Sequence, residues 1–258
     1  MQTELWISER NWFVEWFNCS AYHVLYGNRD EVEATRFIQA LAKTYFPPPP
    51  AQTLDLACGA GRHVRSMVAI GYESYGVDLS TQSIAIARAQ SSTPDRFQVQ
   101  DMRTFATALN WSRSFDAITC LFTSFGYFEE RSDLDQTLKQ IHQALRPGGT
   151  FILDFLNVHQ VAANLVASER VLRMDGKGSV IEFQLNRRIH EGWIEKSIQY
   201  ADDSGNHHFV ERVRALDREA LEGLLHTAGF QIKSVLGDYA LEPYTLKSNR
   251  CIIVASCS

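Results

Sequence analysis

The feature that most constrains the fold of this chain is a tight turn with two glycines, which follows directly on a short apolar segment. The segment reads Leu54-Asp55-Leu56-Ala57-Cys58-Gly59-Ala60-Gly61. Glycine is needed where the backbone turns sharply or approaches a ligand closely. The next residues, 62–70, read as a helix whose free N–H groups and positive dipole end would face the turn. This order of strand, glycine turn and helix predicts an α/β fold with a ligand site at the turn.

The same alternation of strands and helices continues along the chain. Apolar strands are expected at residues 53–57, 74–77, 97–100, 115–122 and 150–155. Ser80 is a good N-cap for a helix over 81–90, and a second, amphipathic helix is expected over 134–145. The run Pro147-Gly148-Gly149 ends that helix. Strands that are almost continuously apolar predict a mostly parallel sheet with helices on both faces.

The pattern changes after the fifth strand. Four strand-like runs separated by turn residues occupy 171–174, 180–189, 193–201 and 209–214, which hairpin connections explain most simply. Asp217 is then expected to cap a helix that ends near Gly229. Two last strands near 231–236 and 251–255 complete a seven-stranded sheet, so the four runs form an antiparallel β insert after strand five.

The N-terminal segment is aromatic and helical in character. Trp12, Phe13, Trp16 and Phe17 repeat with the spacing of one helix face, and a second helix is expected over 30–45 before the prolines at 47–50. We expect Trp12, Trp16 and Phe17 to be core residues. The predicted organisation is an N-terminal helical cap (1–50), a cofactor-binding core (51–168), the antiparallel insert (169–216) and a completion of the core (217–258).

Composition and charge exclude several classes of protein. The formal net charge of −5 argues against broad binding to nucleic acid, which needs a basic surface. The chain has no apolar run long enough to cross a bilayer, and its first residues lack an apolar signal core, so we expect a cytoplasmic protein. The five cysteines are widely spread with no C-x-x-C pair, so neither a disulfide framework nor a metal site is expected.

Two nucleotide-binding patterns can be compared with the glycine turn. A dinucleotide fingerprint requires G-x-G-x-x-G, but Val64 stands in place of the third glycine, and no G-K-[ST] follows as a P-loop would require. An acidic residue, Asp55, precedes the turn. The segment therefore resembles the first motif of class I S-adenosylmethionine-dependent methyltransferases, which have a Rossmann-like fold.

Four further segments carry the resemblance in the family's order. They are Tyr75-Gly76-Val77-Asp78-Leu79-Ser80, Asp101-Met102, Phe115-Asp116-Ala117-Ile118-Thr119-Cys120-Leu121-Phe122 and Leu145-Arg146-Pro147-Gly148-Gly149-Thr150-Phe151. In the family, the second motif's carboxylate accepts hydrogen bonds from both ribose hydroxyls, and the third motif binds adenine. The resemblance covers residues 53–156 well, together with the last helix and two strands.

The resemblance implies S-adenosyl-L-methionine as cofactor, with S-adenosyl-L-homocysteine as product. The cofactor-binding residues that it implies, with two tyrosines expected between the two N-terminal helices, are Tyr22, Tyr26, Asp55, Ala57, Gly59, Gly61, Arg62, Asp78, Leu79, Asp101, Met102, Leu121 and Phe122. His63 is expected to pack or to cap the helix rather than to act as a base.

The acceptor pocket is expected to border residues 123–128, after the fourth strand. Expected substrate-binding residues are Ser124, Phe125, Tyr127, Arg212 and Tyr244, and candidate catalytic bases, chosen by position only, are His23, Tyr127 and Asp154. The N/D-P-P-[YF] tetrad of nucleic-acid amino-methylating enzymes is absent, which favours N- or O-methylation of a small molecule. The insert is expected to roof this pocket or to form a homodimer contact.

Two other functions remain open at this stage. One is a non-methylating enzyme of the same fold that uses the same cofactor, although the acidic pair of spermidine-synthase-like enzymes after strand four is absent. The other is a cofactor-binding protein without catalysis.

Overall fold

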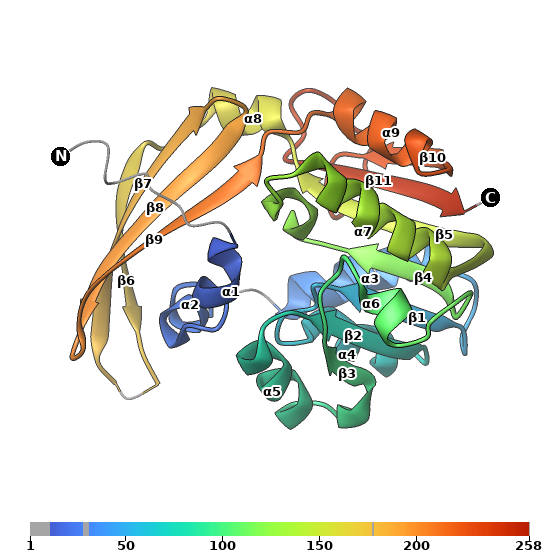
Figure 1. The fold of residues 1–258 in the computed structure, drawn as a ribbon, viewed down its shortest axis with the longest axis horizontal. Helices are drawn as coiled ribbons and strands as arrows, with labels where there is room; N and C mark the ends of the chain where they lie inside the picture. Colours follow the sequence, from blue (N-terminus) through green and yellow to red (C-terminus); the bar gives the residue numbers. More distant parts are fainter. Residues whose placement is uncertain (1–10, 28–30, 177, 258) are drawn as a thin grey trace.

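The computed structural model describes residues 11–27, 31–176 and 178–257. Its main sheet has seven strands in the order β10-β11-β5-β4-β1-β2-β3 (Figure 1). The strands are β1 (Gln52–Leu56), β2 (Glu73–Asp78), β3 (Phe97–Val99), β4 (Phe115–Cys120), β5 (Leu145–Leu156), β10 (Phe230–Leu236) and β11 (Arg250–Cys257). β11 runs antiparallel to both of its neighbours, β10 and β5, whereas the other strand pairs of this sheet are parallel. The predicted mostly parallel seven-stranded sheet is confirmed.

Helices cover both faces of this sheet, as predicted. On one face pack α6 (Phe105–Ala108), α7 (Arg131–Ala144) and α9 (Arg218–Thr227), whose apolar side chains join Leu54 and Ile118 in one cluster. On the other face lie α3 (Glu31–Thr44), α4 (Arg62–Ala69) and α5 (Thr81–Ala89). The Ser80 hydroxyl accepts from the Ser83 N–H at 3.0 Å, which confirms Ser80 as the N-cap of α5.

The connection at Pro147-Gly148-Gly149 belongs to β5 rather than to a loop. Phe115 pairs with Leu145, whereas Ala117 pairs with Thr150, so the extra residues form an irregularity in the ladder. The carboxylate of Asp116 accepts from the Gln52 N–H at 2.8 Å and pairs with Arg146 at 2.6 Å. This contact fastens the irregularity to the start of β4.

A second, antiparallel sheet follows β5 and the short helix α8 (Val158–Ala163). It contains β6 (Ser168–Met174), β7 (Val180–His190), β8 (Trp193–Asp202) and β9 (Gly205–Arg214) in sequential order. Its inner face buries Phe183, Leu185, Ile198 and Tyr200 in the same cluster that lies under α7 and α9. The predicted antiparallel insert after strand five is confirmed.

The N-terminal segment lies between the two sheets (Figure 1). It forms two short helices, α1 (Trp12–Trp16) and α2 (Ser20–Leu25), and the start of the expected helix over 30–45 falls outside the described residues. Tyr22 and His23 therefore lie within α2, and not between two helices as expected; Tyr26 is the C-cap of α2. The helices are fixed by packing of Trp12, Phe13 and Trp16 into the shared core, a tertiary effect that periodicity does not reveal.

Candidate active site

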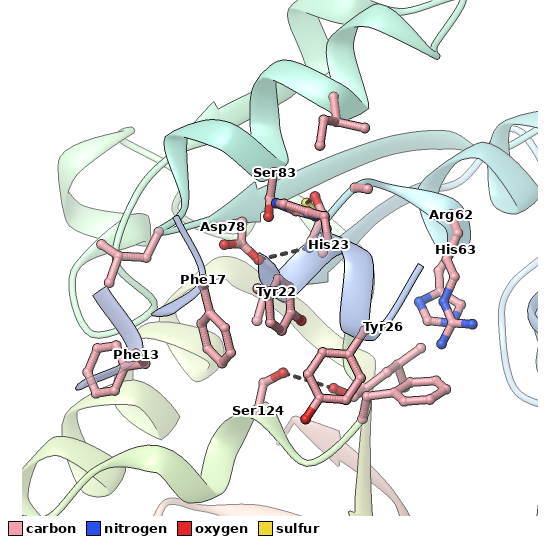
Figure 2. Close-up of a pocket in the computed structure, with 18 of the residues that line it drawn as sticks. Phe13, Phe17, Tyr22, His23, Tyr26, Arg62, His63, Asp78, Ser83 and Ser124 are labelled. Carbon is pink, nitrogen blue, oxygen red and sulfur yellow. Dashed lines mark hydrogen bonds between the residues drawn. The ribbon is translucent and has the colours of Figure 1, made fainter. Parts of the chain in front are cut away.

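A cavity of about 370 Å³ lies at the carboxyl ends of β1 to β4, beneath α1 and α2. This volume falls within the range of roughly 300 to 1,000 Å³ that is usual for small-molecule sites. Figure 2 shows side chains from the core and from the N-terminal helices pointing toward one another across it. The core contributes Ala57, Cys58, Gly59, Arg62, His63, Asp78, Leu79, Asp101, Met102, Leu121, Phe122 and Ser124; the N-terminal segment contributes Phe13, Phe17, Tyr22, His23 and Tyr26.

The two glycines of the turn, Gly59 and Gly61, have different structural roles. Both have positive φ, at 54° for Gly59 and 78° for Gly61, a conformation that other residues adopt only with strain. A Cβ on Gly61 would lie 2.6 Å from Cε1 of Phe97, so Gly61 allows the turn to pack against β3 and does not line the cavity. A Cβ on Gly59 would meet nothing within 4 Å. Gly59 therefore leaves open space beside the backbone where a ligand can approach.

Asp78 lies at the end of β2 with both carboxylate oxygens fixed. Oδ2 accepts from the Gly59 N–H at 2.8 Å, which ties β2 to the glycine turn, and Oδ1 accepts from the Ser80 N–H at 2.8 Å. Burial raises the pKa of Asp78 above its usual value, and the hydrogen bonds from Ser80 and Gly59 oppose that rise. Such a carboxylate gains from additional hydroxyl donors in the cavity.

Asp101 lies where the chain leaves β3. Its carboxylate is bidentate with the Arg103 guanidinium, at 2.6 Å from Oδ2 to Nη2, and Arg103 also pairs with Asp133 on α7 at 3.1 Å. This bracing fixes the direction of Asp101 at the rim of the cavity. A carboxylate offers about four acceptor positions, so Asp101 can still meet a donor from a ligand.

The chain leaves β4 through a strained corner. Phe122 and Thr123 have positive φ values of 57° and 70°, which ends the strand at Cys120, earlier than expected. Asp154 stabilises this corner: its Oδ2 accepts from the Phe122 N–H at 3.0 Å and from the Tyr239 hydroxyl at 3.1 Å. The corner directs the Phe122 ring into the cavity, with the Arg62 guanidinium 4.1 Å from the ring centroid.

The opposite wall of the cavity is aromatic. Phe17 is 5.3 Å from Tyr127 and 4.9 Å from Tyr22, measured between ring centroids. Our expectation that Phe17 is a core residue was wrong in part, because it packs on the core and lines the cavity as well. These rings form an apolar surface facing the polar strand ends.

A partly buried cluster around Glu211 on β9 fixes this aromatic wall. The Glu211 carboxylate accepts from Trp16 Nε1 at 2.7 Å and from the Tyr26 hydroxyl at 2.7 Å. Lys196 on β8 lies 3.3 Å from Glu211 and also donates to the Tyr26 hydroxyl. The second sheet thus anchors the C-terminal ends of both α1 and α2 over the cavity.

Several residues expected at the site lie away from the cavity. Asp154 is fully buried and paired with Arg250 at 2.7 Å, so a role as base toward a ligand does not fit its position. Phe125 is fully buried in the core. The Tyr244 hydroxyl donates to Asn157. Asp55 lies behind the glycine turn, where its carboxylate accepts from the Thr119 hydroxyl at 2.7 Å.

Arg212 also lies away from the cavity. Its guanidinium pairs with Glu195 at 3.0 Å and with Glu129 at 2.7 Å. Next to it, Arg214 donates to the carbonyl oxygens of Phe128 and Glu129. The short helix η3 (Ser124–Tyr127) borders the cavity through Ser124 and Tyr127. Both arginines of β9 therefore hold the residues that directly follow this helix.

Sequence reasoning did not assign a ligand role to several residues that line the cavity, among them Phe13, Phe17 and His63. The sequence signal that could have found His63 is its position in the first turn of the helix after the glycine turn. Within the described residues, no group of three or more His, Cys, Asp or Glu side chains could hold a metal ion. No helix in that part of the chain is long and apolar enough to cross a membrane.

Comparison with known proteins gives one consistent family. Residues 53–149 match the family model of a methyltransferase domain. The chain is 33% identical over 202 residues, 74% of each chain, to a dTDP-3-amino-3,6-dideoxy-alpha-D-glucopyranose N,N-dimethyltransferase of Streptomyces fradiae. It is 29% identical over 145 residues to the putative methyltransferase YqeM of Bacillus subtilis. That second alignment spans 55% of this chain and only 56% of the Bacillus protein.

A solved structure shows the same fold. The structure of CalS10 with bound S-adenosylmethionine, an amino pentose methyltransferase from Micromonospora echinaspora, superposes with a TM-score of 0.66. The alignment covers 92% of this chain and 97% of that one at 22% identity. At this identity the likeness shows the fold alone.

Proposed function

The chain belongs to the class I S-adenosylmethionine-dependent methyltransferases, and from that premise we propose that it methylates a nitrogen atom of a small-molecule amine. The observation that carries the proposal is the meeting of Gly59, Asp78 and Asp101 at the carboxyl ends of three neighbouring strands, in one cavity. Ligands of open α/β sheets bind at such strand ends.

The residues present fit the cofactor. Gly59 leaves room beside its Cα for close approach, and Asp78 offers two fixed acceptor oxygens to a pair of hydroxyls. Asp101, with Met102 beside it, would receive the adenine amine, while Leu121 and Phe122 border the methionyl end. When bound, S-adenosylmethionine supplies a methyl group on a positively charged sulfur.

The chain's own contribution is to position the acceptor and to exclude water. The acceptor atom must lie about 3 Å from the methyl carbon, in line with the breaking bond. Phe17, Tyr22 and Tyr127 line the cavity, and the faces of aromatic rings favour cationic or methylated amine groups. Closure by α1 and α2 removes water from this space.

A nitrogen acceptor is favoured by two observations. The Streptomyces fradiae relative is named for dimethylation of an amino sugar. In addition, the carboxylate that we considered as a base, Asp154, lies outside the cavity. An amine that arrives neutral needs no strong base, whereas oxygen acceptors more often do. His23 and Tyr127 line the cavity and are the side chains that we propose to receive or relay the proton.

Transfer of a radiolabelled methyl group tests this function. The panel should contain amino-sugar nucleotides, simple primary and secondary amines, phenols, and matched sugars in which a hydroxyl replaces the amine. We expect label in amines only, with a second methyl group added to the singly methylated product. Transfer only to phenols or hydroxyls would overturn the nitrogen assignment, and binding of NAD in place of S-adenosylhomocysteine would overturn the cofactor.

We further propose that the second sheet has two roles. One is to position the segment at Phe128 and Glu129 through Arg212 and Arg214. The other is to form a contact between two copies of the chain. We keep as a proposal the division into cap (1–50), core (51–168), insert (169–216) and completion (217–258). The outer face of the second sheet near the β6 edge exposes Leu172, Met174 and Val180 by 61%, 72% and 62%.

This outer apolar patch fits a second copy of the chain. The exposed Arg170 and Glu182 flank it and lie 3.7 Å apart, so a two-fold arrangement would place opposite charges across the contact. Light scattering of the wild type and of a Leu172→Lys, Met174→Lys variant tests it. We expect a dimer for the wild type and a monomer for the variant; a wild-type monomer at high concentration would contradict the proposal.

A further inference from the structure

His63 carries a buried polar atom that the fold leaves without a partner. The side chain lies in the first turn of α4, is 5% exposed, and lines the cavity. Its Nδ1 faces Oδ2 of Asp55 at 3.5 Å, whereas Nε2, on the other side of the ring, has no hydrogen-bond partner among the described residues. Buried polar atoms are rarely left unsatisfied, so an unpaired nitrogen on a side chain that lines a cavity points to a ligand.

Asp55 is fixed by the central strands. It is 1% exposed and lies on β1, which is paired on both sides with β2 and β4. The Thr119 hydroxyl on β4 donates to its Oδ1 at 2.7 Å. Oδ2 makes no hydrogen bond within the described chain and faces His63. A carboxylate in this position favours the imidazole tautomer with hydrogen on Nδ1, which leaves a lone pair on Nε2.

His63 lies at the end of the cavity where β1 and β4 end, beside Phe122 and Arg62. The His63 ring lies 5.7 Å from the Phe122 ring, tilted by 30°, and the Arg62 guanidinium lies 4.1 Å from the same Phe122 ring. An acceptor nitrogen and a guanidinium therefore stand side by side where β1 and β4 end (Figure 2). Asp78 and Asp101 lie at the ends of β2 and β3, on the other side of β1.

We propose that Asp55 and His63 form a positioning pair whose Nε2 accepts a hydrogen bond from the α-ammonium group of the cofactor's methionyl part. The neighbouring Arg62 receives the α-carboxylate. This assignment rests on the proposed function and adds to it the residues that recognise the amino-acid end of the ligand. An α-amino acid presents a cation and an anion on adjacent atoms, and this pair of side chains offers the complementary groups at adjacent positions.

Calorimetric titration with three ligands tests the proposal without relying on turnover. The ligands are S-adenosylhomocysteine, its decarboxylated analogue, which keeps the amine, and 5′-methylthioadenosine, which lacks the whole amino-acid group. For His63→Leu we expect about 10-fold weaker binding of the first two ligands and binding of the third within twofold of wild type. His63→Gln should recover part of the loss, because its amide oxygen can lie near the Nε2 position.

Asp55→Asn provides a matched test of the pair. The asparagine oxygen can still accept from Thr119, while its NH₂ group faces His63 and favours the tautomer with hydrogen on Nε2. That hydrogen would oppose an ammonium group, so we expect a loss similar to that of His63→Leu, again absent with 5′-methylthioadenosine.

The outcomes separate the alternatives. Equal weakening of all three ligands, with a lower melting temperature, would show that His63 is structural and would overturn the proposal. Unchanged binding of S-adenosylhomocysteine to His63→Leu would do the same. Weakening of S-adenosylhomocysteine but not of its decarboxylated analogue would assign His63 to the carboxylate instead. If the wild type binds none of the ligands, the proposed function itself fails.

Discussion

The two walls of the cavity are built on different physical principles. The core wall consists of strand ends and a glycine turn, where Asp78 is held by two backbone N–H groups and Phe97 leaves no room for a side chain at Gly61. The aromatic wall consists of two short helices held from outside by Glu211 on a different sheet. We therefore expect the core wall to bind the cofactor in one fixed position. The position of the aromatic wall depends on contacts with a distant sheet, and we expect this wall to set which acceptor is bound.

Replacing Asp78 with asparagine tests the core wall, and we expect it to cause the largest loss of ligand affinity. One acceptor oxygen becomes an amide nitrogen, so either the Gly59 contact or a ligand hydroxyl loses its partner. Hydrogen bonds to charged groups contribute about 1.5 to 3 kcal/mol each, so we expect roughly 100-fold weaker binding of S-adenosylhomocysteine in calorimetry. Asp95→Asn, at an exposed position, is the control. An affinity within threefold of wild type would contradict the importance of the core wall.

The two glycines should respond differently to alanine. Gly61→Ala combines strain at φ 78° with a clash against Phe97 and should lower the free energy of unfolding by about 2 to 4 kcal/mol in urea titrations. Gly59→Ala pays only the conformational cost of about 1 to 2 kcal/mol, because its Cβ would enter open space. The Gly59 variant should instead lose ligand affinity. Equal destabilisation by both changes would show that Gly59 is also a packing residue.

Replacing Glu211 with glutamine tests the aromatic wall. The change weakens the hydrogen bonds from Trp16 and Tyr26 and removes the negative charge beside Lys196. We expect kcat/KM for the acceptor to fall about 10-fold, or roughly 1.4 kcal/mol, while the affinity for 5′-methylthioadenosine stays within threefold. Glu222→Gln, which disturbs a surface pair with Arg218 on α9, is the control. A larger loss of nucleoside affinity than of turnover would show that the two walls are not separable.

The smallest expected effect is a pH dependence of cofactor affinity, caused by the Asp78 carboxyl of the core wall. Burial raises the pKa of Asp78, so this carboxyl takes up a proton at a higher pH than an exposed aspartate does. Ligand hydroxyls favour the ionised form, and affinity should therefore fall about threefold as pH decreases from 7 toward 5. Asp78→Asn should remove this dependence. Calorimetry at several pH values measures it, and an affinity that rises on acidification would contradict the assignment.

Much of the core wall could be predicted from the sequence because it depends on local chemistry. The Gly59–Gly61 turn, Ser80 and the two aspartates, Asp78 and Asp101, all lie at or just after the end of a short strand. The parallel sheet brings such strand ends together. The positions of the strands along the chain and the antiparallel insert also followed from hydrophobic pattern and turn residues. The motifs alone could not show that Asp55 lies behind the turn, since strand residues alternate between environments.

The remaining parts of the site depend on contacts between distant segments. Arg212 was expected in the pocket, but Glu195 and Glu129 hold it away, and these partners are separated from it by 17 and 83 residues. Asp154 was considered as a base, but Arg250 neutralises it from β11. Phe17 was expected in the core, and only the position of α1 between the two sheets brings it to the cavity.

The sequence by itself determined the strand-turn-helix framework, the antiparallel insert and the polar groups at the ends of β1 to β3, because these follow from backbone preferences and periodic burial over a few residues. Only the tertiary structure decided which charged side chains are neutralised by partners and which face the cavity, including His63 with its unpaired nitrogen. The physical reason is that pairing and burial depend on the distance between atoms that folding brings together from far along the chain.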